Sequence, residues 1–411
     1  MKVDLVVEPP PIAAALCHGA GEPALEHFRN AAGLEALLRL NGVRRATHAL
    51  VDPDAAAQLD AITAWAVALP AVEARAVFEE PALRGWLGDA ERVVDGDPDA
   101  APLRDLALRL PWILAPRLRE IEARRHWRAV MPPHARAAPI GADFRLRAPD
   151  GRDAAIELAV DDELVVTGSD ARARLGWNPA GELILHEALG FQPLARRRVL
   201  PWIEVFTTED YPELLQSCRD ANIPLVPAGA EIEARVREAL GFLVEAWPDA
   251  LPDIVAMFRG VLALEVPNNR ILSSSSPGTP LVIQLTVRPG EGKVLLAESI
   301  VHEIAHVKLD LLWRIGPLLH DDGNPRWRHP WRPDPRPMRG VLLGAHAFAN
   351  VLCMYQEALA RDIAAATALS EIDARRRELH EALAVLAAHA QLTPNGAALF
   401  AGLCTLADYR P

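Results

Sequence analysis

Apolar residues in the first third of the chain recur three and four positions apart. This spacing places them on one face of a helix, and the segments that show it are rich in Ala, Leu, Glu and Arg. The predicted helices are Pro23 to Asn41, Asp54 to Ala68 and Leu103 to Arg128. Because Pro132 and Pro133 then interrupt the pattern, we predict a helical N-terminal region over residues 1–137.

After residue 138 the pattern changes to short alternating segments, which is typical of half-buried strands. The predicted strands are Phe144 to Ala148, Ala154 to Val160, Glu163 to Thr167, Glu182 to His186 and Trp202 to Thr207. The first two flank the turn sequence Pro149-Asp150-Gly151, so we expect them to form a hairpin. We predict a strand-rich middle region over residues 138–230, and it is a candidate for peptide recognition.

Helical periodicity returns in the last third of the chain. The predicted elements are a helix over Glu231 to Trp247, strands over Val261 to Val266 and Leu281 to Val287, and helices over Ala345 to Ala366 and Glu371 to His389. A further helix is predicted after Glu291 to Lys293, and a last short helix starts at Pro394. We therefore predict a helical metal-binding domain over residues 231–411 with an adjacent strand. The fold class is a mainly helical α+β protein.

Composition excludes several classes of protein. The chain has 411 residues, with 43 Lys and Arg against 55 Asp and Glu, which gives a net charge of −12. An acidic chain is a poor match for nucleic acid, because binding depends on clustered basic residues. Charges interrupt the apolar stretches well before a membrane span. No signal sequence is recognisable and the four cysteines are scattered, so we expect a cytoplasmic protein with reduced thiols.

One motif carries a specific chemistry. His302-Glu303-Ile304-Ala305-His306 is an HExxH sequence, and residues four apart share one face of a helix, so both imidazoles can reach one metal ion. The flanking residues form an apolar stripe that supports a helix. The alternative is an exposed helix that carries two incidental histidines.

Two histidines do not complete a metal site, because a catalytic zinc or iron site needs a third protein ligand. The candidates further along the chain are His320, His329, His346 and Glu357. His346 and Glu357 fall on one face of the predicted helix, about three turns apart. We predict His346 as the third ligand, with Glu357 as the alternative. The opposing interpretations are a buried histidine held by a neighbour and a solvated glutamate.

The segment from Trp327 to Pro337 is rich in proline, arginine and tryptophan. Its prolines restrict the backbone, so Arg332 and Arg336 lie on a stiffened loop. Such arginines suit bidentate capture of a carboxylate beside the metal. The alternative is a structural loop whose arginines pair with acidic residues.

A family resemblance rests on several short segments. They are the HExxH motif followed by Lys308, Leu311 and Leu312, then Pro330-Trp331-Arg332-Pro333-Asp334-Pro335-Arg336-Pro337, then Gly340-Val341-Leu342 and Gly344, and finally Leu392-Thr393-Pro394-Asn395-Gly396. From about Glu231 onward, the chain resembles the HExxH proteins that accompany ribosomally made, post-translationally modified peptides. Members of that family are iron- and α-ketoglutarate-dependent peptide β-hydroxylases. In one departure, His346 is the only histidine on the predicted helix that follows the Gly344 turn, and Phe348 takes the next same-side position.

The resemblance implies a peptide hydroxylase. Fe(II) would bind His302, His306 and His346, and Arg336 or Arg332 would hold the distal carboxylate of α-ketoglutarate. Glu303 would lie beside the metal without binding it, and it would not act as a base. The substrate would be a ribosomally synthesised precursor peptide, and a radical maturase of the same pathway is a candidate partner.

The substrate peptide has two expected contacts. If the strand from Leu281 to Val287 is an edge strand, it can bind the peptide by strand addition, which makes Ile283 a substrate contact. Trp331 is the second predicted contact, since it flanks the proposed metal site.

Two other functions remain open. In a zinc peptidase the same helix would bind zinc, and Glu303 would act as the general base. A non-catalytic peptide-binding partner of a maturation pathway is the third possibility. The two-histidine, one-carboxylate pattern of non-haem iron enzymes favours Glu357 over His346 as third ligand.

Overall fold

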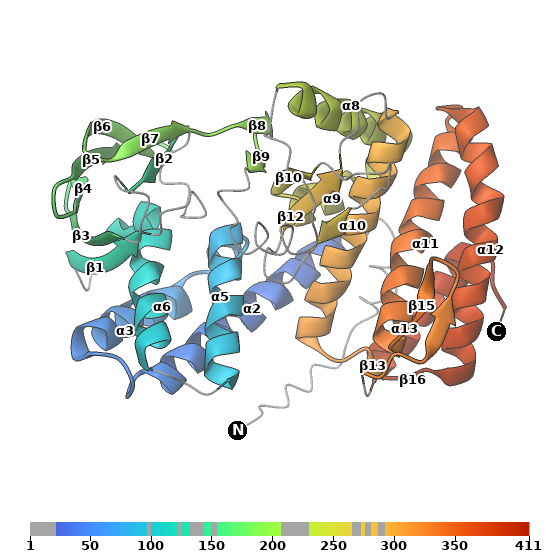
Figure 1. The fold of residues 1–411 in the computed structure, drawn as a ribbon, viewed down its shortest axis with the longest axis horizontal. Coiled ribbons are helices and arrows are strands. Elements are labelled where there is room, and N and C mark those ends of the chain that lie inside the picture. The colour runs from blue at the N-terminus through green and yellow to red at the C-terminus, as the bar shows by residue number, and fades with distance from the viewer. Residues whose placement is uncertain are drawn as a thin grey trace.

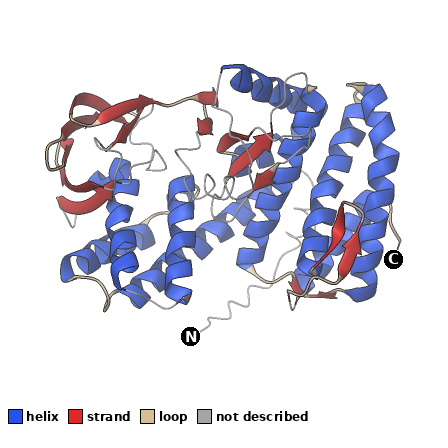
Figure 2. Ribbon diagram, viewed as in Figure 1, coloured by secondary structure: helices blue, strands red, loops and turns tan. Residues whose placement is uncertain are grey.

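The computed structural model describes residues 22–96, 100–121, 125–131, 144–148, 154–206, 230–264, 273–275, 281–286, 292–321 and 323–410. It confirms the mainly helical α+β fold, in which helices and two larger sheets alternate along the molecule (Figure 2). Within these ranges, no helix combines the length and the apolar character that crossing a bilayer requires.

The chain begins with a group of packed helices. They are α2 (Glu22–Thr47), α3 (Pro53–Ala68), α4 (Ala71–Phe78), α5 (Pro81–Asp95) and α6 (Ala100–Ile113), followed by the 3-10 helix η1 (Ala115–Glu120). The side chain of Asp52 accepts a hydrogen bond from the Ala55 amide and so caps α3. The helices predicted from Pro23 and from Asp54 are confirmed.

The helix predicted over Leu103 to Arg128 was wrong in its second half. Helix α6 ends at Ile113, and strand β1 (His126–Met131) occupies the end of the predicted range. Pro111 and Pro116 lack the amide hydrogen that a continuing helix would use. The residues of β1 alternate between exposed and buried, which is the period of a strand.

The first sheet is antiparallel. Its strands are β1, β3 (Ala154–Val160), β4 (Glu163–Thr167), β5 (Arg172–Trp177) and β6 (Leu183–Leu189), in that order. The predicted hairpin between residues 144 and 160 was wrong, since β2 (Phe144–Arg147) pairs with β7 (Gln192–Ala195). Both edges of β3 are taken by β1 and β4, so no edge of β3 is available to β2.

Two hydrophobic cores organise the described residues, and the chain passes from one to the other twice. The first core runs from Ala36 to Phe191 and joins the N-terminal helices to the first sheet. The second core contains Leu25 and Phe28 from the start of α2 together with residues from Val199 to Ala407. The helices and the sheet that we placed in separate regions, with a boundary at 137, therefore share one core. The chain crosses from the first core to the second between β7 and β8 (Arg198–Leu200).

The second sheet supports the metal-site helix. Its order is β11 (Ser274–Ser275), β12 (Val282–Thr286), β10 (Gly260–Leu264), β9 (Ile203–Phe206) and β8, and β10 runs parallel to β9 and β12. The expectation that the strand from Leu281 to Val287 is an edge was wrong. Strand β12 lies between β10 and the short β11, and Ile283 is fully buried. Ile283 therefore cannot contact a substrate peptide.

The last third of the chain is a layer of long helices. The helices of this part are α8 (Ala230–Ala246), α9 (Leu251–Met257), α10 (Lys293–Ile315), α11 (Met338–Ala360), α12 (Ala365–His389) and α13 (Pro394–Ala407), with the 3-10 helix η3 (Pro248–Ala250). The connection between α10 and α11 contains β13 (Leu319–His320), which pairs with β16 (Gln391–Leu392), and the hairpin of β14 (Trp327–His329) and β15 (Arg332–Arg336). Figure 1 shows α10, α11 and α12 side by side, with this hairpin close to the ends of α11 and α12.

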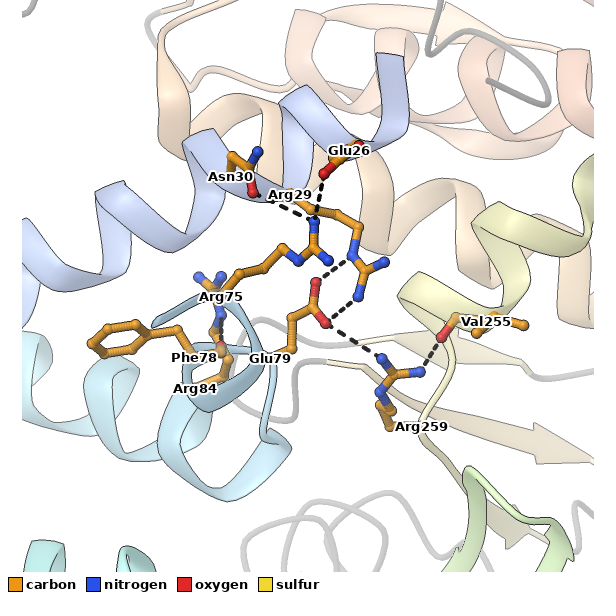
Figure 3. Close-up of polar contacts among 9 residues, drawn as sticks. All are labelled: Glu26, Arg29, Asn30, Arg75, Phe78, Glu79, Arg84, Val255 and Arg259. Atoms are coloured by element: carbon orange, nitrogen blue, oxygen red, sulfur yellow. Dashed lines mark hydrogen bonds and ion pairs between the residues drawn. The ribbon is translucent and has the colours of Figure 1, made fainter. Parts of the chain in front are cut away.

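A partly buried ion-pair cluster joins the two cores (Figure 3). Glu79, directly after α4, accepts two hydrogen bonds from Arg29 on α2. The same carboxylate lies 3.5 Å from Arg259, which precedes β10. Because Glu79 is the shared anion between two cations from different elements, removing its charge leaves both arginines without their counter-ion.

We expect Glu79→Gln to lower the free energy of unfolding by about 3 kcal/mol, since the two partly buried guanidinium groups lose their counter-ion. Guanidinium-induced unfolding followed by tryptophan fluorescence measures the change. Glu357→Gln is the matched control, because Glu357 and its partner Arg361 are 40 % and 41 % exposed. The control should cost about 0.5 kcal/mol or less. An equal effect of both substitutions would contradict a structural role for Glu79.

Candidate metal site

The HExxH motif lies in the middle of α10, as the sequence predicted. The rings of His302 and His306 meet edge to face with centroids 4.6 Å apart. Potential ligand atoms of His302, Glu303 and His306 all lie within 4.8 Å of one another, and no other such group of three occurs in the part of the chain that the structure describes. The helix turn thus delivers two nitrogen donors and one carboxylate to the same place.

Packing on several sides holds α10 in place. The helix contacts α8, α9 and α11 as well as the second sheet, and Leu296, Ile300 and Leu309 are fully or almost fully buried. Two residues after the motif, the ammonium group of Lys308 donates a hydrogen bond to Asp253 on α9, and both side chains are buried. An ion pair of this kind fixes the rotation of the helix about its axis, because a rotated helix would leave both charges buried without partners.

A row of polar side chains runs along one face of α10. Glu298, His302, His306 and Asp310 follow one another at intervals of four, and all four line the same cavity. Each end of the row is paired with an arginine from another helix: Glu298 with Arg375 at 3.1 Å and Asp310 with Arg339 at 3.1 Å.

We did not predict Glu298 and Asp310 as site residues. The signal for them was present in the sequence, since they extend the spacing of the two histidines by one helical turn in each direction. What the sequence does not show is that this face of the helix borders a cavity.

Burial determines the charge of both histidines. Burial, together with the charge of Arg332, lowers the pKa of His306 to about 4. It also lowers the pKa of His302 well below the ordinary value, with His306 and Arg375 as further causes. Both imidazoles are therefore neutral at neutral pH, which is the form that binds a metal.

Glu303 is almost completely buried, and this burial raises its pKa to about 7, although hydrogen bonds from Ser273 and Ser275 oppose the shift. Its Oε2 atom and the Nδ1 atom of His306 are buried and make no hydrogen bond to any residue within the described ranges. Unsatisfied buried acceptors are costly, and a divalent cation bound to this group would satisfy them. The residues present thus fit a metal ion.

The site opens into a cavity of about 1150 Å³ that is bounded by α10, the start of α11 and the hairpin β14–β15. Arg332 and Arg336 both line it, as predicted. The alternative, in which the arginines of the loop pair with acidic residues, fits only Arg336, which pairs with Asp334 at 2.9 Å. Arg332 makes no hydrogen bond or ion pair with the rest of the described chain. Arg332 is therefore the arginine with free donors for an anion.

An aromatic wall forms one side of the cavity, and Trp331 belongs to it, in agreement with its predicted place near the site. Its ring stacks on Phe348 with centroids 4.4 Å apart, and Phe348 meets His302 edge to face at 4.8 Å. The indole nitrogen of Trp331 donates a hydrogen bond of 3.0 Å to Glu378 on α12. A Cβ atom at Gly344 would lie 2.9 Å from the indole, so glycine is needed there for the hairpin to dock.

The structure does not bring His346 into the ligand group. Gly344 and Phe348 line the cavity, whereas His346, two residues from each on α11, is not among the residues that line it. Its side chain is fully buried in the helical layer. His346 is near enough to contribute to the lowered pKa of His302, but its ring nitrogens do not join the cluster.

Glu357 is also outside the site. It lies nine residues beyond Phe348 on the same helix, pairs with Arg361 at 3.7 Å and is 40 % exposed. It does not line the cavity. Neither predicted third ligand, His346 or Glu357, belongs to the group of ligand atoms in the structure, and the carboxylate in that group is the neighbouring Glu303.

Comparison with protein-family models finds no family that matches the chain, and a search of curated proteins also finds no match.

We expect His302→Ala and His306→Ala each to weaken metal binding by at least about 100-fold, since each removes one donor of the cluster. His346→Gln and Glu357→Gln should bind metal as the unmodified protein does. Equilibrium dialysis with iron or zinc, followed by elemental analysis, measures the affinity, and circular dichroism checks the fold. Loss of metal from a correctly folded His346→Gln protein would show that His346 is a ligand.

Proposed function

We propose that the protein is an iron- and α-ketoglutarate-dependent enzyme that hydroxylates the β-carbon of a residue in a ribosomally synthesised precursor peptide. The observation that carries this proposal is one cavity that combines two neutral histidines, a carboxylate and an arginine with free donors. The family resemblance of the sequence agrees with it.

The proposed ligands of Fe(II) are His302, His306 and Glu303. Two histidines and one carboxylate are the donor set of non-haem iron oxygenases. Glu303 replaces Glu357 in this set, because its ligand atom is the one within reach of both histidines. When bound, iron with α-ketoglutarate activates dioxygen for insertion into a carbon–hydrogen bond, and this is the cofactors' chemistry rather than the protein's.

The protein's part is to bind and orient. Arg332 is the proposed clamp for the distal carboxylate of α-ketoglutarate, since it lines the cavity and contributes to the lowered pKa of both histidines. Arg336 is the weaker candidate because Asp334 already holds it. A guanidinium group binds a carboxylate through two parallel hydrogen bonds, which would fix the position of the cosubstrate relative to the metal.

The cavity has room for more than the cosubstrate. At about 1150 Å³ it exceeds the range of about 300–1,000 Å³ that is usual for small-ligand sites. Its aromatic wall of Trp331 and Phe348 can pack against a peptide side chain. These features support a peptide segment as substrate, with Trp331 as one of its contacts.

A zinc peptidase is the second candidate, and Glu303 favours it. A pKa of about 7 is close to the best value for a general base at neutral pH. In this alternative His302 and His306 hold zinc, and Glu303 takes the proton of the attacking water. Nothing in such a reaction requires a free arginine on the hairpin.

Turnover distinguishes the two candidates. A ribosomally synthesised precursor peptide is the substrate to test, with iron, α-ketoglutarate and dioxygen. We expect succinate to form together with a peptide 16 Da heavier. Cleavage of the peptide by the zinc-loaded protein, without any effect of α-ketoglutarate, would replace the hydroxylase proposal by the peptidase alternative.

Arg332→Gln should raise the concentration of α-ketoglutarate needed for half-maximal turnover by about tenfold or more, because a charge-assisted pair is lost. Metal content should stay unchanged. Arg361→Gln is the control, since Arg361 lies at the end of α11 and outside the cavity. If Arg332→Gln has the same α-ketoglutarate dependence as the control, Arg332 is not the clamp.

Glu303→Gln separates the two roles of the carboxylate. As an iron ligand, Glu303 is needed for affinity, so the variant should lose iron as His306→Ala does. As a general base in a zinc enzyme it is not a ligand, so the variant would keep its zinc and lose only turnover. Elemental analysis of the variant, beside its activity, decides between these outcomes.

A further inference from the structure

A second cavity adjoins the metal site on the side of the N-terminal helices. Its volume is about 420 Å³, and it lies between α2, α5 and the last turns of α10. Asp310 and Arg339 line both this cavity and the cavity of the metal site. The two cavities are therefore neighbours, with the ion pair of Asp310 and Arg339 at their common boundary.

Most of the charged groups in the second cavity already have a partner. Arg39 pairs with Glu91 and, at 3.3 Å, with Glu35. Arg339 pairs with Asp310 at 3.1 Å, and its guanidinium group lies over the ring of Trp313. These pairs balance the arginines and carboxylates that take part in them.

Arg314 is different from these residues. It lines the cavity from the last turn of α10, and it makes no hydrogen bond or ion pair with another residue in the described ranges. Burial and the nearby Arg39 lower its pKa, and the carboxylates of Glu35, Glu91 and Asp310 oppose the shift without an ion pair to Arg314. In addition, the Nη1 atom of Arg39 is buried and has no hydrogen-bond partner in the described part of the chain.

We propose that the second cavity binds an acidic side chain of the peptide substrate, with Arg314 as its cationic partner and Arg39 Nη1 as a further donor. The inference rests on the proposed function, since the metal site supplies the reason for a peptide. The size of the cavity supports a side chain with its backbone, because a single water molecule takes about 30 Å³. It also gives the N-terminal helices a role in substrate selection.

Peptide retention, without turnover, tests this inference. The probe is a defined pool of acetylated, amidated hexapeptides in which each Glu-containing peptide has a Gln counterpart. The pool is passed over immobilised, metal-loaded protein in the absence of dioxygen, with excess succinate to occupy the hairpin arginines, and retained peptides are quantified by mass spectrometry. We expect the protein to retain Glu peptides about tenfold better than their Gln counterparts.

Variants of Arg314 show whether it causes the preference. Arg314→Gln should bring the ratio close to one, Arg314→Lys should keep part of it, and Arg314→Glu should favour peptides that contain Lys. Arg361→Gln, an arginine outside both cavities, should leave the ratio unchanged. Circular dichroism of each variant checks the fold, and the Lys variant keeps the test valid if the Gln variant does not fold.

Two outcomes would overturn the inference. One is a Glu preference that survives in Arg314→Gln. The other is a preference that succinate abolishes, which would assign the effect to Arg332 or to binding of a free dicarboxylate. This experiment measures binding and not turnover. If the preference for Glu peptides depends on Arg314 but the protein shows no hydroxylase activity, only the proposed reaction is refuted. Hydroxylation without the preference would refute only the acidic subsite.

Discussion

The site depends on placing a row of polar groups on a helix that is otherwise buried. Glu298, His302, His306 and Asp310 are removed from water by α11, α12 and the hairpin, and burial opposes charge on each of them. The two histidines respond by staying neutral, while Arg375 and Arg339 compensate the carboxylates at the ends. The metal-binding state of the site is thus set by helices that carry no ligand themselves.

The same helix connects the two cores of the molecule. Its last turns reach the cavity beside α2 and α5, and α2 itself begins in the second core with Leu25 and Phe28. The Glu79 cluster adds an ionic link at the same junction. The N-terminal helices therefore form one wall of the region around the proposed catalytic site, and a change in that lobe can alter what the site accepts.

Several arginines gather near the site although the chain as a whole is acidic. The net charge is −12, yet Arg332, Arg336 and Arg339 surround the metal-site cavity and Arg314 lies just beyond it. Anionic ligands respond to the field within a cleft more than to a distant average. The proposed cosubstrate and the proposed acidic side chain each use one arginine, Arg332 and Arg314, that has no ion-pair partner in the described part of the chain.

The sequence alone determined the features that depend on short spacings. The HExxH pair lies on one helix because residues four apart always share a face, and alternation located most strands. Tertiary structure decided what depends on distant neighbours: β3 pairs with β1 rather than β2, and β11 covers β12. It also decided that Arg332 is free while Arg336 is held, and that His346 faces the core. A local pattern contains no record of which element packs against it, and burial and ion pairing depend on that packing.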